Sequence, residues 1–242
     1  MKFYLDSADA RQWALPVGCP PVHGVTTNPT LVFQAGLPVT LPTYLHLLQA
    51  AADHGMAELM LQLPSPDAHQ ALEWQAALQA KAVALNVTLT IKLPCHPDWL
   101  PCIHAMQAAN QPLLLTGLSN PVQLLWAQSL KAAYVAPYIG RLATEGRDVW
   151  ALMEACVSVQ ANGPALLAAS IKSPDVLAKL IADYEALWMP VLTALHTSGE
   201  LKAPVGLARL LQDERLTTAA VEQAIQREQR GSEDGHCGSS QN

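Results

Sequence analysis

Charged side chains are scarce in this sequence. Only 14% of its 242 residues are Asp, Glu, Lys or Arg, and their formal sum is -6 at neutral pH. A protein that binds nucleic acid or an acidic membrane surface needs a basic face, so this balance argues against both partners. A small anionic substrate stays compatible with the sequence, provided that a few cations gather at one site.

Long apolar segments and a cysteine framework are also missing. No apolar run reaches the length of about 20 residues that a membrane-spanning helix needs. Residues 1–6 (MKFYLD) meet a carboxylate too early for a signal peptide. The five cysteines lack disulfide-scaffold spacing, and their odd number is typical of free thiols. These absences favour a reduced, cytoplasmic protein with no membrane partner.

Short apolar runs are abundant. The hydrophobic set makes up 50% of the chain, which is enough for one large folded domain. Eight runs are interpreted as strands, and several are apolar throughout, as is typical of parallel strands buried on both faces. They lie at residues 3–6, 24–28, 58–63, 89–93, 113–118, 134–138, 165–170 and 187–191.

Helix-like stretches separate these runs. The clearest covers residues 67–85, where apolar residues recur at helical spacing after a potential N-cap at Asp67. Asp98, Asn120 and Ser173 are expected to cap other helices. Eight strand–helix alternations in about 230 residues predict an α/β protein with a (β/α)8 barrel, the TIM barrel. An open doubly wound sheet is the alternative.

The pattern loosens after the eighth run. Helices are expected at residues 204–212 and 217–230, and a small, polar, disordered tail at 231–242. There is no internal repeat or interdomain linker, so we expect one domain over residues 1–230.

A chemically useful residue ends or follows almost every predicted strand. In a (β/α)8 barrel the carboxyl ends of the strands meet at one face, where active sites are built. Taken singly, each residue has an ordinary explanation such as a cap, a turn or a solvated charge. The hypothesis of an active site depends on all of these residues meeting at the same face of the barrel. The residues are Asp6, Thr26, Thr27, Asn28, Gln62, Lys92, Thr116, Tyr138, Arg141, Ser170 and Lys172.

Lys92 is the expected nucleophile. It lies in the apolar run TIKLP at residues 90–94, where desolvation lowers the pKa of an amine and frees it to attack a ketone. Asp6 and Asn28 are expected to position the amine and to hydrogen-bond substrate hydroxyls. This set suits a Schiff-base enzyme.

Proton transfer and phosphate binding have candidates as well. Tyr138, alone or through a water held by Gln62 and Thr116, suits the acid–base role. Arg141 and Ser170 suit a phosphate, because a guanidinium can bind it through two hydrogen bonds. The full expected substrate-binding set is Thr26, Thr27, Arg141, Ser170 and Lys172.

We expect neither a metal nor an organic cofactor. Cys95, His96, Cys102 and His104 lie close in sequence, but their spacing matches no familiar zinc pattern. Residues 102 and 104 stand at i and i+2 of an expected helix and so face different directions. Ordinary packing is the favoured interpretation of all four.

Four segments resemble the transaldolase family. GVTTNPT at residues 24–30 is similar to its second-strand motif, and IKLP at 91–94 to the strand that carries its Schiff-base lysine. YVAPYIGR at 134–141 and LAASIK at 167–172 resemble its sixth and seventh strands. The resemblance runs from Phe3 to about residue 191, and the 24–30 match is the most specific.

The resemblance implies a class I aldolase-type barrel that acts on phosphorylated ketoses without metal, in carbohydrate metabolism around the pentose phosphate pathway. The family contains transaldolases and shorter fructose-6-phosphate aldolases. Classical transaldolases carry a glutamate on the third strand and a phenylalanine on the sixth. This chain has Gln62 and Tyr138, the aldolase-like pair, and its length also matches the short branch.

The chain departs from the family pattern in three places. The segment after Lys92 continues PCHPDW at residues 94–99 where the family usually has Pro-x-Thr and a glycine, and Thr116 is followed by GLSN. Residues 198–216 are interpreted as an insertion. The resemblance implies a homo-oligomer that swaps its last helix, although residues 219–229 lack the aromatic anchors of such a helix.

The leading hypothesis is reversible aldol cleavage of a ketose phosphate such as fructose 6-phosphate into dihydroxyacetone and glyceraldehyde 3-phosphate. A transaldolase that passes the three-carbon unit to an acceptor aldose phosphate is the first alternative. An inactive sugar-phosphate-binding barrel is the second, kept open by the altered segment after Pro94.

Overall fold

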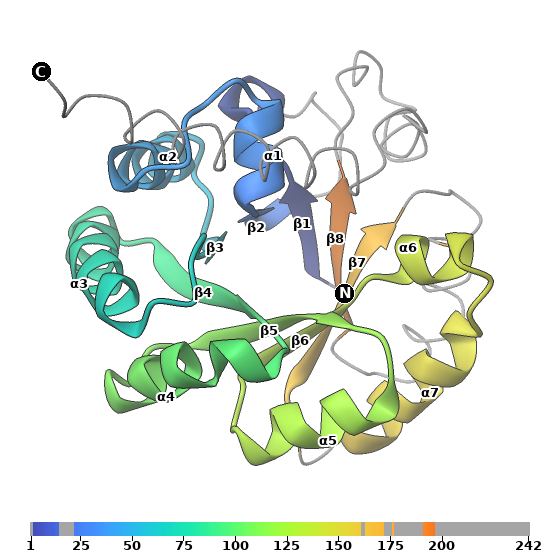
Figure 1. Cartoon of the computed structure of the whole chain (residues 1–242). Helices are drawn as coiled ribbons and strands as arrows, with labels where there is room; N and C mark the ends of the chain where they lie inside the picture. The colour runs from blue at the N-terminus through green and yellow to red at the C-terminus, as the bar shows by residue number, and fades with distance from the viewer. Residues whose placement is uncertain (1, 15–21, 161–162, 172–175, 177–190, 197–242) are drawn as a thin grey trace, which may run out of the picture.

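The computed structural model describes residues 2–14, 22–160, 163–171, 176 and 191–196. Its centre is a closed barrel of eight parallel strands in chain order (Figure 1). Residues Lys2 to Asp6 of the first strand pair with Leu192 to His196 of the last, which closes the barrel and rules out the open sheet. The (β/α)8 prediction is confirmed. The strands are β1 (Lys2–Asp6), β2 (Val22–Thr27), β3 (Glu58–Gln62), β4 (Thr88–Pro94), β5 (Leu113–Leu118), β6 (Tyr134–Pro137), β7 (Ala165–Ile171) and β8 (Val191–His196).

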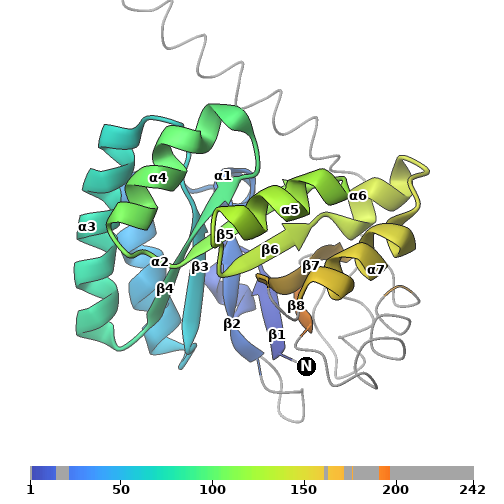
Figure 2. The same ribbon diagram turned by 90° about the horizontal axis from the view of Figure 1, so that it is seen from below.

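Helices surround the strands, and the view from below shows α3, α4, α5 and α7 outside the sheet (Figure 2). The α-helices are α1 (Pro29–Gln34), α2 (Leu41–Asp53), α3 (Ala68–Leu85), α4 (Leu100–Ala108), α5 (Pro121–Ser129), α6 (Ile139–Thr144) and α7 (Val149–Gln160); short 3-10 helices are η1 (Ala10–Gln12) and η2 (Pro97–Trp99). No helix in the described ranges is both long and apolar enough to cross a membrane.

Helix caps follow the sequence in most places. The Asp67 carboxylate accepts hydrogen bonds from the backbone N–H groups of residues 69 and 70, so α3 begins where expected. The Asn120 side chain caps α5 in the same way. Asp98 is a correction, because it lies inside η2 and the cap there is His96. Ser173 lies outside the described residues.

The eighth strand is also a correction. It was expected at residues 187–191, and the structure places it at Val191–His196, so the two share only Val191. Pro190 lies within the expected segment, and proline lacks the N–H that a strand ladder needs. The aliphatic run after it pairs with both neighbouring strands instead. The expected helices and tail after residue 200 and the 198–216 insertion lie outside the described residues.

Alternation along the strands separates two apolar layers. One face of each strand from β1 to β7 packs against the helices and belongs to the main core, with residues such as Leu5, Val25 and Ile91. The other face fills the barrel. A second, smaller cluster lies there: Tyr4, Met60, Leu114, Ala136, Leu167 and Ala169. This apolar layer lies inside the barrel, directly before the polar residues at the carboxyl ends of the strands.

A buried carboxylate lies below that layer. The Glu58 carboxylate is only 3% exposed and accepts hydrogen bonds from the Tyr4 hydroxyl at 2.7 Å and the Thr90 hydroxyl at 2.6 Å. Gly24 is required beside it, because a Cβ there would stand 2.2 Å from the Glu58 carbonyl oxygen. The bridge joins β1, β3 and β4, the strands that carry Asp6, Gln62 and Lys92 at their far ends.

Candidate active site

The predicted residues gather where the strands end. Strand pairing places Asp6 beside Thr26 and Gln62 beside Lys92. Thr116 pairs with Pro94, two residues after Lys92 on the same face of β4. Because all the strands are parallel, these residues lie at the carboxyl end of the barrel, where a (β/α)8 enzyme builds its site.

Lys92 lies inside the barrel wall with only 4% of its surface exposed. Its strand neighbour is Leu114, a member of the cluster that fills the barrel. Burial lowers the pKa of the Lys92 amine, and the nearby Asp6 carboxylate opposes that shift. The amine is therefore easier to deprotonate than an ordinary lysine, which is the property that a nucleophile needs.

The Asp6 carboxylate is fixed by its neighbour on β2. The Thr26 hydroxyl donates a 2.6 Å hydrogen bond to Asp6 Oδ1, and both residues are buried. A charge-assisted hydrogen bond of this kind holds a carboxylate in place. Asp6 thus keeps a defined position toward the Lys92 amine.

A hydroxyl pair lies on β5 and on the residue that follows β6. The Thr116 hydroxyl donates to the Tyr138 phenol oxygen at 2.9 Å, which fixes the position of the phenol. The Arg141 guanidinium lies over the Tyr138 ring, 5.2 Å from its centre. Gln62 contributes a buried side-chain oxygen that accepts no hydrogen bond from the described residues.

Other predicted residues are placed less directly. Thr27 is fully buried and alternates with Thr26, so it shares the outer face of β2 with Val25 and does not join Asp6 and Lys92. The Asn28 side-chain oxygen caps α1 by accepting from the Leu31 N–H at 3.0 Å, and its amide N–H groups donate to no other residue that the structure describes. Lys172 lies outside the described residues.

Ser170 occupies an irregular end of β7. Its backbone has a φ of 60°, a left-handed conformation that costs a non-glycine residue free energy. The pairing of β7 with β8 shifts between Ala168 and Ile171, which is the position of the irregularity. Irregular strand ends of this kind re-aim side chains beside functional sites.

The altered segment after Pro94 is anchored to β5. The Cys95 N–H donates to the Thr116 carbonyl at 2.9 Å, and the thiol lies 3.7 Å from the Gln123 carbonyl. Burial raises the pKa of the Cys95 thiol to about 11, so it is a poor nucleophile. Gln123 was not among the predicted residues. Nothing in its local sequence indicates a contact with a residue 28 positions earlier.

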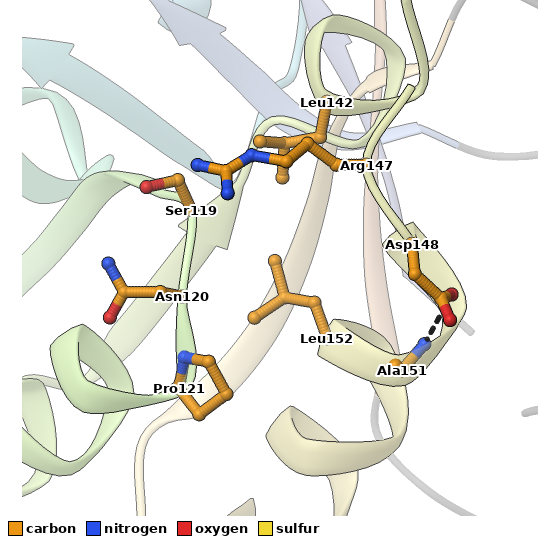
Figure 3. Close-up of a pocket in the computed structure, with 8 residues that line it drawn as sticks. All are labelled: Ser119, Asn120, Pro121, Leu142, Arg147, Asp148, Ala151 and Leu152. Atoms are coloured by element: carbon orange, nitrogen blue, oxygen red, sulfur yellow. Dashed lines mark hydrogen bonds between the residues drawn. The ribbon is translucent and has the colours of Figure 1, made fainter. Parts of the chain in front are cut away.

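A hollow of about 250 Å³ lies beside the carboxyl end of β5 (Figure 3). Its walls come from the segment after β5, with Ser119 and Asn120, and from α6, α7 and the turn between them. In the figure the Arg147 guanidinium extends toward Ser119, whereas the Asp148 carboxylate faces the Ala151 N–H of its own helix.

Comparisons with known proteins point in one direction. Residues 3–181 match the family described as Transaldolase/Fructose-6-phosphate aldolase. A protein named Probable transaldolase from Desulfatibacillum aliphaticivorans is 26% identical over 217 residues, which cover 88% of this chain and 97% of that protein. A Probable transaldolase from Aquifex aeolicus is 25% identical, with 88% and 96% covered. With the closed barrel and the match over most of its length, the chain belongs to the transaldolase/fructose-6-phosphate aldolase family of enzymes.

Proposed function

We propose that this enzyme is a Schiff-base aldolase that reversibly cleaves a ketose phosphate such as fructose 6-phosphate. The observation that carries the proposal is the buried Lys92, whose pKa burial lowers, with Asp6 beside it inside the barrel. Family membership favours this reading over an inactive sugar-phosphate-binding barrel.

The first step joins Lys92 to the substrate. The unprotonated Lys92 amine attacks the ketone carbon and gives a carbinolamine. The carbinolamine hydroxyl takes up one proton and leaves as water, and a cationic imine forms. The Asp6 carboxylate, fixed by Thr26, favours that cation as it develops. The Asn28 amide N–H groups, which the α1 cap leaves unused, are proposed to bind substrate hydroxyls.

The second step breaks the bond between the third and fourth carbons. Its electrons move into the imine, which gives an enamine on Lys92 and releases glyceraldehyde 3-phosphate. The fourth-carbon hydroxyl loses its proton, and the enamine carbon later gains one. Tyr138 is the proposed proton carrier, helped by a water between Gln62 and Thr116, because a phenol can give and take a proton and the Thr116 hydroxyl holds its oxygen at 2.9 Å. Hydrolysis of the imine then frees dihydroxyacetone.

The phosphate is proposed to lie near the ends of β6 and β7. Arg141, in the first turn of α6, supplies a charged guanidinium that can donate two hydrogen bonds to one phosphate. Ser170 supplies a hydroxyl from the irregular end of β7. Lys172 is expected to add a second cation there.

Adduct mapping tests the proposal. Incubation with fructose 6-phosphate and borohydride should add the mass of the reduced sugar to Lys92, as peptide mass spectrometry would read. Lys92→Arg should give neither adduct nor turnover, because a guanidinium stays protonated and forms no imine. Normal turnover by Lys92→Ala would contradict the scheme.

A transaldolase is the second candidate, favoured by the names of the relatives. It shares every step up to the enamine, which then waits for an acceptor aldehyde. Gln62 and Tyr138, the pair that resembles the aldolase branch, support the lyase. Release of free dihydroxyacetone without an acceptor separates the two, since a transferase should release almost none.

We also propose a homo-oligomer. Helix α5 leaves Val122 73% and Leu125 58% exposed, one helical turn apart, which is compatible with a subunit contact. A monomer mass from light scattering would contradict this.

A further inference from the structure

We infer that Gln123 is a positioning residue for the reaction, because its amide fastens the segment after Lys92 to the segment after Thr116. The inference rests on the proposed function. Gln123 is the third residue of α5 and touches none of the proposed reacting groups. It would act by fixing β4, which carries Lys92, against β5, which carries Thr116, the hydrogen-bond partner of Tyr138.

One end of the amide holds the segment after β5. Gln123 Oε1 accepts from the Ser119 N–H at 2.8 Å, the Ser119 hydroxyl at 3.2 Å and the Asn120 amide at 3.1 Å. Ser119 stands three residues after Thr116. The hollow in Figure 3 borders Ser119 and Asn120 on another side.

The other end of the amide holds the segment after β4. Gln123 Nε2 donates to the Cys95 carbonyl at 3.0 Å, and Cys95 stands three residues after Lys92. The Cys95 N–H in turn donates to the carbonyl of Thr116. A single side chain therefore closes a loop of hydrogen bonds from the Lys92 strand to the strand whose Thr116 binds Tyr138.

Helix capping alone does not explain a glutamine here. Capping accounts for the Oε1 bonds, and a glutamate would make them with the added benefit of a negative charge at a helix N-terminus. The bond to the Cys95 carbonyl needs a donor, which glutamate lacks at neutral pH. The amide is the group that satisfies both ends, because the Ser119 N–H can only donate and the Cys95 carbonyl can only accept.

Two partial reactions with dihydroxyacetone test the inference. Reductive trapping reports imine formation on Lys92, and deuterium uptake from heavy water at the carbon next to the imine, read by NMR, reports proton transfer. In Gln123→Leu we expect trapping within about threefold of wild type and deuterium uptake lower by about ten- to a hundredfold, because small displacements of an acid–base group have costs of that size. Gln123→Glu should show a similar defect at neutral pH. It should recover as the pH falls, because a protonated carboxyl can again donate to the Cys95 carbonyl.

Gln111→Leu is the matched control. Gln111 is 6% exposed and donates to the Leu89 carbonyl at 2.8 Å, so it joins the same two strands at their opposite ends. We expect this variant to lose stability in urea unfolding yet to keep the wild-type ratio of deuterium uptake to trapping. A purely structural role for Gln123 predicts that both variants behave alike, and that result would overturn the inference.

The outcomes separate the inference from the proposed function. Trapping on Lys92 with deuterium uptake unchanged in Gln123→Leu would overturn the inference and leave the aldolase proposal standing. No trapping in wild-type protein with any ketose would overturn both. Should Gln123→Leu not fold, Gln123→Glu, which keeps the cap, supplies the same comparison through its recovery at low pH.

Discussion

Two opposing influences act on the Lys92 amine. Burial disfavours its charged form and lowers its pKa, and the Asp6 carboxylate favours that form and raises the pKa. The proposed reaction uses both, since the attacking amine must be neutral and the imine that follows is a cation. The balance between them is open to measurement at a single residue.

Asp6→Asn should move the pH dependence of imine formation to lower pH. The carboxylate that supports the protonated amine is lost, burial remains, and the pKa of Lys92 falls further. The rate of trapping with dihydroxyacetone and cyanoborohydride, followed from pH 5 to 10, should rise with a more acidic midpoint than in wild type. Turnover should nevertheless fall by about a hundredfold, because the cation loses its partner. A midpoint that stays in place or moves to higher pH would show that Asp6 does not act on Lys92.

The Glu58 carboxylate joins strands β1, β3 and β4 through hydrogen bonds from Tyr4 and Thr90. Each of these two donors stands two residues before a site residue, Asp6 or Lys92, so the placement of the site depends on them. Thr90→Val removes the hydroxyl that donates to the buried Glu58 carboxylate. We expect a loss of about 2 kcal/mol in the free energy of unfolding, because hydrogen bonds to buried charges have this size. Urea unfolding measures it.

Thr88→Val is the control on the same strand. Thr88 is exposed and makes no hydrogen bond through its side chain within the described part of the chain, so its replacement should change stability by less than about 0.5 kcal/mol. Equal losses in the two variants would mean that the bridge to Glu58 adds nothing beyond the general effect of a threonine-to-valine change.

Elements also show where sequence patterns succeed and fail. Strands whose apolar run ends at a proline or a polar residue on each side, such as β4 and β5, were predicted almost to the residue. The apolar stretch around Pro190 is longer than one strand, and only pairing with β1 and β7 selects Val191–His196. The Thr26–Thr27 pair was predicted as two site residues, yet alternation sends only one side chain inward. The Gln123–Cys95 bond joins different elements, and no local pattern contains it.

Over the whole molecule, charge is scarce and negative. There are 14 lysines and arginines against 20 acidic residues. The proposed phosphorylated substrate has the same sign of charge as the protein, so the proposal assigns its recognition to a few cations near the carboxyl ends of the strands. Arg141 is one of them, because α6 starts directly after β6 and carries it over Tyr138.

Arg141→Gln should separate recognition of the phosphate from chemistry on the ketone. We expect KM for fructose 6-phosphate to rise by about ten- to a hundredfold, because one or two charge-assisted hydrogen bonds of about 1.5–3 kcal/mol are lost. Trapping of unphosphorylated dihydroxyacetone on Lys92 should stay within about twofold of wild type. Arg147→Gln is the matched control, since Arg147 is an exposed residue that lines the hollow, six residues further on. It removes the same charge from the molecule, so any effect of net charge alone would appear in both variants.

If KM for fructose 6-phosphate rises equally in the two variants, the phosphate is recognised by the general field of the protein and not by a site at Arg141. If dihydroxyacetone trapping falls as far as the affinity for fructose 6-phosphate, Arg141 acts on the reaction itself through Tyr138.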